Sequence, residues 1–373
     1  GSEMCIRDSC YADHFSSSYC FFKDNKTYNG KAGEEQVRKR TRNHNLSIKG
    51  IFKLGNRHKL SVGTEYIVDV LKSQTDNIAK EDAYTLALFA QDEIKLLRNL
   101  QALIGVRYIY HENFKNHATP NVALMYKPGK FNFRASYAAG FRTPTLSELY
   151  ATDIAKKNDR LTIGNLDLKP EKNNYFSLSA EYVHERFSVS VNAFYNNIRD
   201  MIDYNTIATG DKAMEQYGHK EVRQRDNIAE AKVHGINVSA NAYLGAGFNL
   251  SGGYTHLNTQ DVELEQPIDK SIKNAYNINA QWAHSWKIYR LNINLNGRIN
   301  SKRFSKSYGY APEYQLWDLN TRHSFNLKSV IIEPGFGMEN LFDYMDDRPY
   351  NSNYATLTPG RSFYISLSLK FKS

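Results

Sequence analysis

Residues 290–300, RLNINLNGRIN, alternate between apolar and polar side chains at nearly every position. Leu291, Ile293 and Leu295 take odd positions, and asparagine fills positions 292, 294 and 296. Successive side chains of a β-strand point to opposite faces of the sheet. The stretch therefore predicts a strand with one apolar face and one hydrated face.

The same alternation recurs elsewhere in the chain. It is clearest in RFSVSVNAF at 186–194, HGINVSANAY at 234–243, NAYNINAQWAH at 274–284 and SFYISLSLKF at 362–371. In the last of these stretches, five apolar side chains share one face: Phe363, Ile365, Leu367, Leu369 and Phe371. We therefore expect an all-β protein whose strands each have one wet side.

Short turn signals alternate along the chain with longer polar segments. Turns are predicted at 55–57, 98–99, 127–130, 184–186, 244–247, 285–287 and 326–329. Longer segments are predicted at 73–82, 112–118, 141–172, 203–224, 259–271, 302–312 and 343–358. Short turns at one end and long loops at the other are typical of an outer-membrane barrel. We expect about sixteen antiparallel strands, each long enough for the roughly 9–11 residues of a membrane-spanning strand.

The composition excludes the other way of crossing a membrane. Of the 373 residues 41% are hydrophobic, the mean hydropathy is −0.60, and no apolar run is long enough for a transmembrane helix. Lipid cannot satisfy free backbone groups, so a spanning chain without helices must form a closed barrel. A soluble sandwich is the alternative, but its strands would have only about 5–6 residues. The predicted fold is a transmembrane antiparallel β-barrel.

The net charge of +9 raises nucleic acid and anionic membranes as partners. Basic residues are mostly dispersed, and the one cluster, VRKRTRNH at 37–44, is not followed by a nucleic-acid recognition fold. We expect solvated strand ends and no nucleic-acid partner. Cys5, Cys10 and Cys20 form no CxxC motif and have no histidine at zinc spacing, so neither a metal site nor a cofactor is predicted.

The first nine residues, GSEMCIRDS, fit none of the later alternation and lack the apolar core of a signal peptide. We expect residues 1–9 to be a non-native leader. Residues 10–373 are expected to form the C-terminal part of an outer-membrane barrel.

Several motifs resemble the TonB-dependent receptor family of Gram-negative outer membranes. They are FRTPTLSELY at 141–150, GNLDLKPEK at 164–172, VSVNAFYNNIRDMIDY at 189–204 and NIAEAKVHGINVSANAYL at 227–244. GFGMENLFDYMDDRPY at 335–350 and PGRSFYISLSLKF at 359–371 are similar to the family's last two strands. The resemblance covers the chain from about residue 80 onward.

The resemblance implies a multi-pass barrel that imports ferric siderophores, haem or cobalamin with energy delivered through TonB. Plugged transporters of this type have 22 strands. We therefore expect a C-terminal fragment of such a barrel, without the N-terminal plug and without about six strands. The resemblance also implies contacts with lipid and lipopolysaccharide, and recognition of the last strand by the assembly machinery. Lys372 and Ser373 follow Phe371, whereas the family's aromatic residue is last.

The FRTP stretch predicts the end of a strand. Pro144 cannot donate to a strand ladder and restricts Thr143, so pairing stops there and an external loop begins. Arg142 and Glu148 are expected to fix the base of this loop, with direct ligand contact as the alternative.

Ligand chemistry is predicted only in outline. Haem iron favours an axial histidine or tyrosine, for which Tyr150 and His219 are candidates, but no histidine lies between Arg142 and Lys169, where haem receptors usually place one. Other loop candidates for binding an anionic siderophore are Tyr204, Tyr217, Tyr308, Tyr310, Arg348, Tyr350 and Tyr354. The competing explanation for these side chains is an interfacial aromatic belt with contacts to lipopolysaccharide phosphates.

No enzyme is predicted. The chain has no GxSxG, HExxH or P-loop motif and no complete GxGxxG, so no catalytic residue is expected. The leading hypothesis is active uptake of a scarce nutrient, namely a ferric siderophore or other iron chelate, or haem. Cobalamin is an alternative within the family. A passive porin and a ligand-binding or adhesion barrel are the alternatives of other classes.

Overall fold

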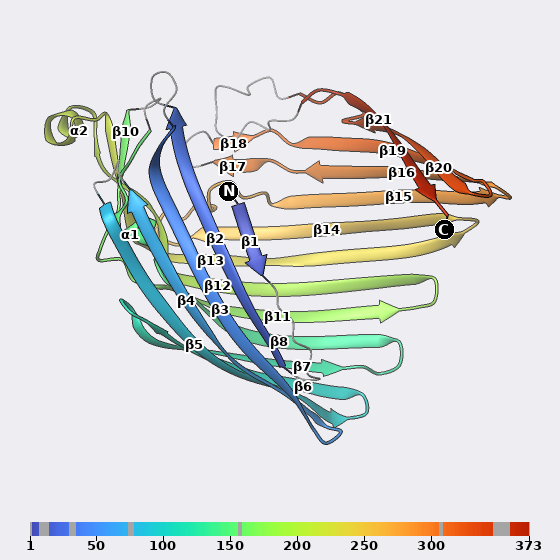
Figure 1. Cartoon of the computed structure of the whole chain (residues 1–373), viewed down its shortest axis with the longest axis horizontal. Helices are drawn as coiled ribbons and strands as arrows, with labels where there is room; N and C mark the ends of the chain where they lie inside the picture. Colours follow the sequence, from blue (N-terminus) through green and yellow to red (C-terminus); the bar gives the residue numbers. More distant parts are fainter. Residues whose placement is uncertain are drawn as a thin grey trace. The chain divides into compact units, whose positions relative to one another are not determined.

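The computed structural model describes residues 2–6, 15–29, 35–73, 78–155, 159–305, 309–345 and 359–372 (Figure 1). Sixteen of the strands in this part of the chain have ten or more residues, which confirms the expected number. The same part of the chain also contains five strands of five residues or fewer and two short helices. Neither described helix is long and apolar enough to cross a membrane.

The chain divides into two compact units. The first comprises residues 1–125, 136–176 and 196–230, and the second comprises 126–135, 177–195 and 231–373. The first unit contains β1 (Ser2–Ile6), β2 (Phe15–Asn29), β3 (Glu35–Leu54), β4 (His58–Ser73), β5 (Ile78–Leu97), β6 (Leu100–His111), α1 (Leu146–Tyr150), β9 (Asp153–Ala155), β10 (Arg160–Ile163) and α2 (Gly210–Tyr217). The second contains β14 (Phe248–Asp261), β15 (Asn274–Trp286), β16 (Tyr289–Asn300), β17 (Arg303–Ser305), β18 (Gly309–Ala311), β19 (Tyr314–Asn326), β20 (Val330–Glu339) and β21 (Ser362–Phe371). The division falls within β7 (Lys115–Tyr126), β8 (Phe131–Arg142), β11 (Glu171–Val183), β12 (Phe187–Thr209) and β13 (Glu221–Gly245).

In the first unit, β2 to β6 pair antiparallel in chain order. Leu46, Tyr66 and Leu86 lie beside one another on β3, β4 and β5, and all three are exposed. The opposite face is polar: Asn45 Nδ2 donates to Glu65 Oε1 over 2.8 Å, and Glu65 also pairs with Arg107. Each strand therefore has one apolar and one polar face, as the alternation predicted.

The second unit carries the same arrangement across more strands. An apolar row crosses from β14 to β21 in register: Leu250, Ala280, Leu295, Leu319, Met338 and Phe363. On the other face, Asn279 Nδ2 donates to Asn294 Oδ1 and Asn296 Oδ1, each over 2.6 Å. The predicted apolar face of β21 is strongly exposed, with Ile365 at 77%. Large apolar side chains thus lie outside rather than in a core.

The short turns fall close to the predicted positions, for example 55–57 and 98–99. The longer segments differ more. Of the predicted segment 203–224, β12 continues to Thr209 and β13 begins at Glu221, with α2 between them. Polar composition suggested a loop there, but backbone pairing continues through polar residues. Residues 346–358 of the last long segment lie outside the described part.

Buried apolar side chains of the first unit gather at the ends of the strands that carry the long connections. Leu71, Ala83 and Leu146 form one cluster, and Leu149, Leu168 and Ile202 form another. These clusters hold α1 and the 164–170 segment against the strands. Figure 1 shows α1, β10 and α2 gathered at this end of β4 and β5. We call this layer of α1, β9, β10, α2 and their connections the loop layer.

Candidate functional site

Arg142, at the end of β8, is held by two carboxylates. Its Nε donates to Glu171 Oε2 over 2.8 Å and its Nη2 to Glu171 Oε1 over 2.5 Å. Its Nη1 donates to Glu148 Oε2 over 2.9 Å. Glu171 Oε1 also accepts from the backbone N–H of Ile202 on β12. This geometry gives Arg142 and Glu148 the structural role expected of them, since Arg142 joins β8, α1 and β11.

Glu148 belongs to a capping box at the start of α1. Glu148 N donates to Thr145 Oγ1 over 3.2 Å, and Thr145 N donates back to Glu148 Oε2 over 2.8 Å. Burial alone would raise the pKa of Glu148, but the hydrogen bonds from Arg142 and Thr145 outweigh it and hold the pKa below its usual range. Glu148 is therefore ionised at neutral pH and pairs with Arg142.

Asn227, near the start of β13, makes a second connection to the loop layer. Its Nδ2 donates to Lys169 O over 2.9 Å and to Asp200 O over 2.6 Å. Its Oδ1 accepts from Lys169 N over 2.7 Å. The Asn227 side chain thus gives the backbone of Lys169 the pair of hydrogen bonds that a neighbouring strand would supply. Through Asp200 it also joins the 164–170 segment to β12.

His219 connects the α2–β13 turn to the β9–β10 hairpin. Its Nδ1 lies 2.9 Å from Asp159 Oδ1, and Lys220 N donates to Asp159 O over 3.0 Å. The hydrogen bond with His219 lowers the pKa of Asp159. His219 Nδ1 is therefore held by a neighbouring loop, as is common for the nitrogen of a metal-binding histidine that does not itself ligate the metal.

Tyr204, on the exposed part of β12, pairs with Arg225. The guanidinium carbon of Arg225 lies 3.7 Å from the centre of the Tyr204 ring, and its Nη2 donates to the phenol oxygen over 2.6 Å. The Tyr204 side chain is 42% exposed, so this cation–π pair faces solvent.

Each of the other described candidates has surroundings of its own. Tyr150 packs against both buried clusters of the loop layer. Burial, and then the negative charges of Glu81 and Glu112, raise the pKa of Tyr150, which disfavours the phenolate that binds haem iron. Tyr217 is half-buried at the end of α2, and Tyr310 in the second unit stacks edge-on against Phe304. Four candidates lie outside the described residues: Tyr308, Arg348, Tyr350 and Tyr354.

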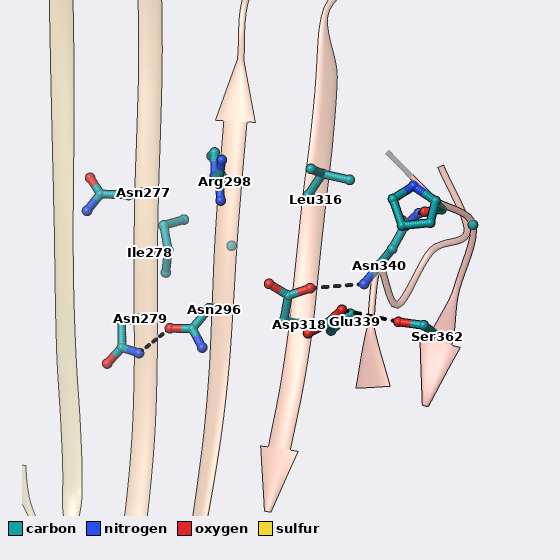
Figure 2. Close-up of a pocket in the computed structure, with 13 residues that line it drawn as sticks. Asn277, Ile278, Asn279, Asn296, Arg298, Leu316, Asp318, Glu339, Asn340 and Ser362 are labelled. Atoms are coloured by element: carbon teal, nitrogen blue, oxygen red, sulfur yellow. Dashed lines mark hydrogen bonds between the residues drawn. The ribbon is translucent and has the colours of Figure 1, made fainter. Parts of the chain in front are cut away.

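A cavity of about 470 Å³ lies on the face of the second unit that carries the hydrogen-bonded asparagines (Figure 2). On one side, Asp318 Oδ1 accepts from Asn340 N over 2.9 Å, and Ser362 Oγ donates to Glu339 Oε2 over 3.2 Å. The Asn279–Asn296 pair lies on the other side. The cavity offers amides and carboxylates, as a hydrated lumen wall requires.

Aromatic side chains gather at the short-turn end of the second unit. Trp286, Tyr289 and Phe325 lie beside one another on three strands, with ring centres 5.6 and 5.0 Å apart. The Tyr289 hydroxyl lies 2.7 Å from His323 Nδ1. Amphipathic rings at the edge of an apolar face suit a membrane interface. These three rings are therefore suited to an interfacial position at this end of the second unit.

Three residues that contact the loop layer or its neighbouring strands were missed by the analysis of the sequence: Glu171 on β11, and Asn227 and Arg225 on β13. Glu171 and Asn227 lie inside quoted motifs, but a motif does not state which distant group a side chain meets. Within the described ranges, no group of three histidine, cysteine or acidic side chains could hold a metal ion.

The comparisons place the chain in a family. The sequence model of the TonB dependent receptor-like, beta-barrel family matches residues 8–341, so the chain belongs to that family. The match begins well before residue 80, where the resemblance was expected to start, and stops before β21.

Solved structures share the fold. The ferric enterobactin receptor PfeA of Pseudomonas aeruginosa is 19% identical with a TM-score of 0.77, and the match covers 96% of this chain and 60% of PfeA. The siderophore receptor PirA of Pseudomonas aeruginosa is 17% identical with a TM-score of 0.71, over 96% of this chain and 64% of PirA. The FrpB iron transporter of Neisseria meningitidis is 13% identical with a TM-score of 0.71, over 98% of this chain and 62% of FrpB. The chain thus spans about 60% of the length of these receptors.

Proposed function

We propose that this chain forms barrel wall and external loops of a TonB-dependent outer-membrane receptor that takes up a ferric siderophore or another iron chelate. The observation that carries the proposal is the pair of opposite faces in each unit. One face exposes rows of large apolar side chains, and the other carries hydrogen-bonded asparagines and charges. Water would not stabilise such an apolar surface, whereas lipid would.

In each unit, the connections at the ends of the strands indicate how the protein is oriented in the outer membrane. In the first unit, the long connections at one end of the strands are fixed by the Arg142, Asn227 and His219 contacts. In the second unit, a short turn carries the Trp286–Tyr289 pair. Long, ordered connections face the outside in outer-membrane barrels, and short turns face the periplasm. The loop layer is accordingly the proposed site of ligand recognition.

An iron chelate is favoured over haem. The similar structures are described as ferric enterobactin and siderophore receptors and as an iron transporter. Of the two haem-ligand candidates, Tyr150 is packed against both buried clusters, whereas His219 pairs with Asp159 through Nδ1 alone. No observation favours cobalamin. The same proposal includes energy coupling through TonB and a plug, binding of lipopolysaccharide, and recognition by the assembly machinery. It also includes the absence of catalysis.

Growth under iron limitation tests the proposal. The gene that encodes this chain, read from its natural start, is expressed in a Gram-negative strain that lacks its own siderophore receptors. We expect at least one ferric chelate to restore growth, and we expect deletion of tonB to abolish the rescue. Rescue that survives the deletion would indicate a passive pore. Failure of a panel of catecholate, carboxylate and hydroxamate chelates, with the barrel assembled in the outer membrane, would contradict the proposal.

A further inference from the structure

We infer that the short-turn end of β15, β16, β19, β20 and β21 binds the headgroup of an anionic glycerophospholipid. Lys287, Lys328 and Lys372 hold the phosphate, and the acyl chains lie on the apolar face beside Trp286 and Phe371. We call the three lysines the lysine site. The inference goes beyond the uptake of a chelate and rests on the proposed function only for the presence and side of the membrane.

Two of the lysines lie in neighbouring turns. Lys287 follows β15 in the turn to β16, and Lys328 follows β19 in the turn to β20. Asn326 N donates to Ile288 O over 2.7 Å, so a backbone hydrogen bond joins the two turns. The Lys287 and Lys328 side chains are both exposed. They therefore face the surroundings of the protein from adjacent positions.

The last strand brings Lys372 to the same edge. Lys372 N donates to Ser329 O over 3.1 Å, and Lys372 Nζ donates to Leu327 O over 2.8 Å. Both ends of this residue thus touch the turn that contains Lys328. The three members of the lysine site come from separate parts of the sequence, and the pairing of the strands makes them neighbours.

Positive charge at this edge exceeds the negative charge that the protein supplies. The turns and strand ends contain five lysine or arginine residues and one carboxylate, Glu333 (residues 284–290, 324–333 and 366–372). Glu333 is already engaged, because Lys370 Nζ lies 2.6 Å from its Oε2 and Ser324 Oγ donates to its Oε1 over 3.3 Å. No carboxylate within the described ranges pairs with the lysine site. The site is thus suited to an anion from outside the chain.

An exposed apolar surface begins directly beside the lysine site. Phe371 is 82% exposed, Ile288 59% and Trp286 45%. A soluble anion would neutralise the lysines but leave this apolar surface in water, which is unfavourable. A phosphate group attached to hydrocarbon chains meets both needs at once. The combination of ammonium groups and adjacent apolar side chains therefore favours a phospholipid over a soluble anion.

Trp286 offers a further donor to the headgroup. The indole N–H groups of Trp282 and Trp317 donate to Ala246 O and Gln315 Oε1, each over 3.1 Å. Trp286 makes ring contacts, but its Nε1 donates to no acceptor within the described part of the chain. An interfacial tryptophan buries its ring in the apolar layer and directs its N–H to polar groups. The ester or phosphate oxygens of a lipid supply such an acceptor.

The charge balance favours an anionic lipid over a zwitterionic one. A zwitterionic headgroup carries a cation of its own, which would meet three ammonium groups and no free carboxylate at this edge. Each lysine close to an anionic lipid surface contributes about fivefold to binding. In the proposed orientation the short turns face the periplasm, so the lysine site meets the periplasmic side of the membrane.

Lipid titrations on the purified product of the full gene, in a neutral detergent, test the inference. The probes are phosphatidylglycerol and phosphatidylcholine, each brominated on its acyl chains. Bromine quenches tryptophans that the chains touch, so a lipid bound beside Trp286 is detected. We expect phosphatidylglycerol to bind about tenfold tighter or more, and this preference to shrink as salt rises. Lys287→Gln, Lys328→Gln and Lys372→Gln should each weaken phosphatidylglycerol binding about threefold to fivefold and leave phosphatidylcholine binding unchanged.

Lys302→Gln is the matched control, because it removes the same charge from an exposed position at the opposite end of β16. It should leave the binding of both lipids unchanged. Heat-modifiable migration shows whether each variant is folded, and the comparison of the two lipids uses the wild type, so it does not depend on any variant.

Four outcomes would overturn the inference. They are equal affinity of the wild type for both lipids, folded lysine variants that bind phosphatidylglycerol like the wild type, an equal loss in Lys302→Gln, and displacement of the lipid by an equal concentration of glycerol phosphate. The third would indicate attraction by net charge alone, and the fourth would assign the lysine site to a soluble anion. Each of them leaves chelate uptake intact, which growth under iron limitation measures separately.

Discussion

Arg142 and Glu171 form a two-point ion pair between β8 and β11, with Nε–Oε2 and Nη2–Oε1 distances of 2.8 and 2.5 Å. The parallel geometry matches the planar guanidinium to the planar carboxylate. The two residues are 29 positions apart, and the connection between them contains α1, β9 and β10. The pair therefore closes the base of the loop layer.

Replacing Arg142 tests this closure. Arg142→Gln leaves the carboxylates of Glu148 and Glu171 facing each other, and should destabilise α1 by about 1–2 kcal/mol. The cost is moderated because the Arg142 side chain is 42% exposed. Hydrogen exchange at Leu149 N and Ala151 N, which bond to Thr145 O and Ser147 O, measures the change. Arg142→Lys should lie in between, and unchanged protection in Arg142→Gln would contradict the closing role.

The lowered pKa of Glu148 predicts an acid-sensitive loop layer. The folded-state pKa lies below its ordinary value of 4.5, so on acidification the unfolded state takes up the proton first. The stabilisation is therefore complete above about pH 5 and is lost as pH falls through the folded pKa. Protease sensitivity of the loop layer should rise below pH 4.5, and Glu148→Gln should flatten that rise. A sensitivity independent of pH in this range would refute the prediction.

Asn227 is expected to be intolerant of a change from amide to acid. In Asn227→Asp, an oxygen replaces the Nδ2 group that donates to Lys169 O and Asp200 O, so acceptors face acceptors. We expect a loss of about 2–3 kcal/mol in the stability of the loop layer. Hydrogen exchange at the backbone amide of Lys169 measures this loss of stability. Asn249→Asp, at an exposed position near a short turn, should have little effect.

Substitutions at Ile365 and its neighbour Ser366 test which face of β21 meets lipid. Ile365 is 77% exposed, so in a water-soluble sheet Ile365→Arg would be nearly neutral. If this face meets lipid, Ile365→Arg should lower the free energy of unfolding by about 2–4 kcal/mol near the middle of the bilayer. Ser366→Arg, on the polar face, should be tolerated. Unfolding in urea from lipid bilayers measures both, and equal stability of the two variants would contradict the lipid-facing assignment.

Gly297 makes room for a tryptophan. A Cβ at Gly297 would lie 2.5 Å from Trp317 Cζ3, on the neighbouring strand β19. Gly297→Val should displace the indole, shift tryptophan emission and cost about 1–3 kcal/mol. Gly252→Ala, whose nearest contact would be 3.3 Å away, should change the emission little. An unshifted emission spectrum in Gly297→Val would show that the ring is not confined by this glycine.

Much of the fold followed from local pattern. Alternation in 290–300 and 362–371 predicted the faces of β16 and β21, and turn signals predicted the number of long strands. The boundaries of β12 and β13 were less predictable, because polar residues paired beyond the point where apolar alternation ended. In the candidate site, Arg142 and Glu148 were identified with their structural role, but Glu171 and Asn227 were not.

The sequence by itself determined which side of each strand is apolar, since period two fixes the face whatever the partner strand. Only the tertiary structure decided which polar groups meet: Asn227 with Lys169 across 58 residues, His219 with Asp159 across 60, and Arg225 with Tyr204 across 21. A hydrogen bond acts over a few ångströms between groups that folding alone brings together, and nothing in the local pattern of one segment records the identity of its distant partner.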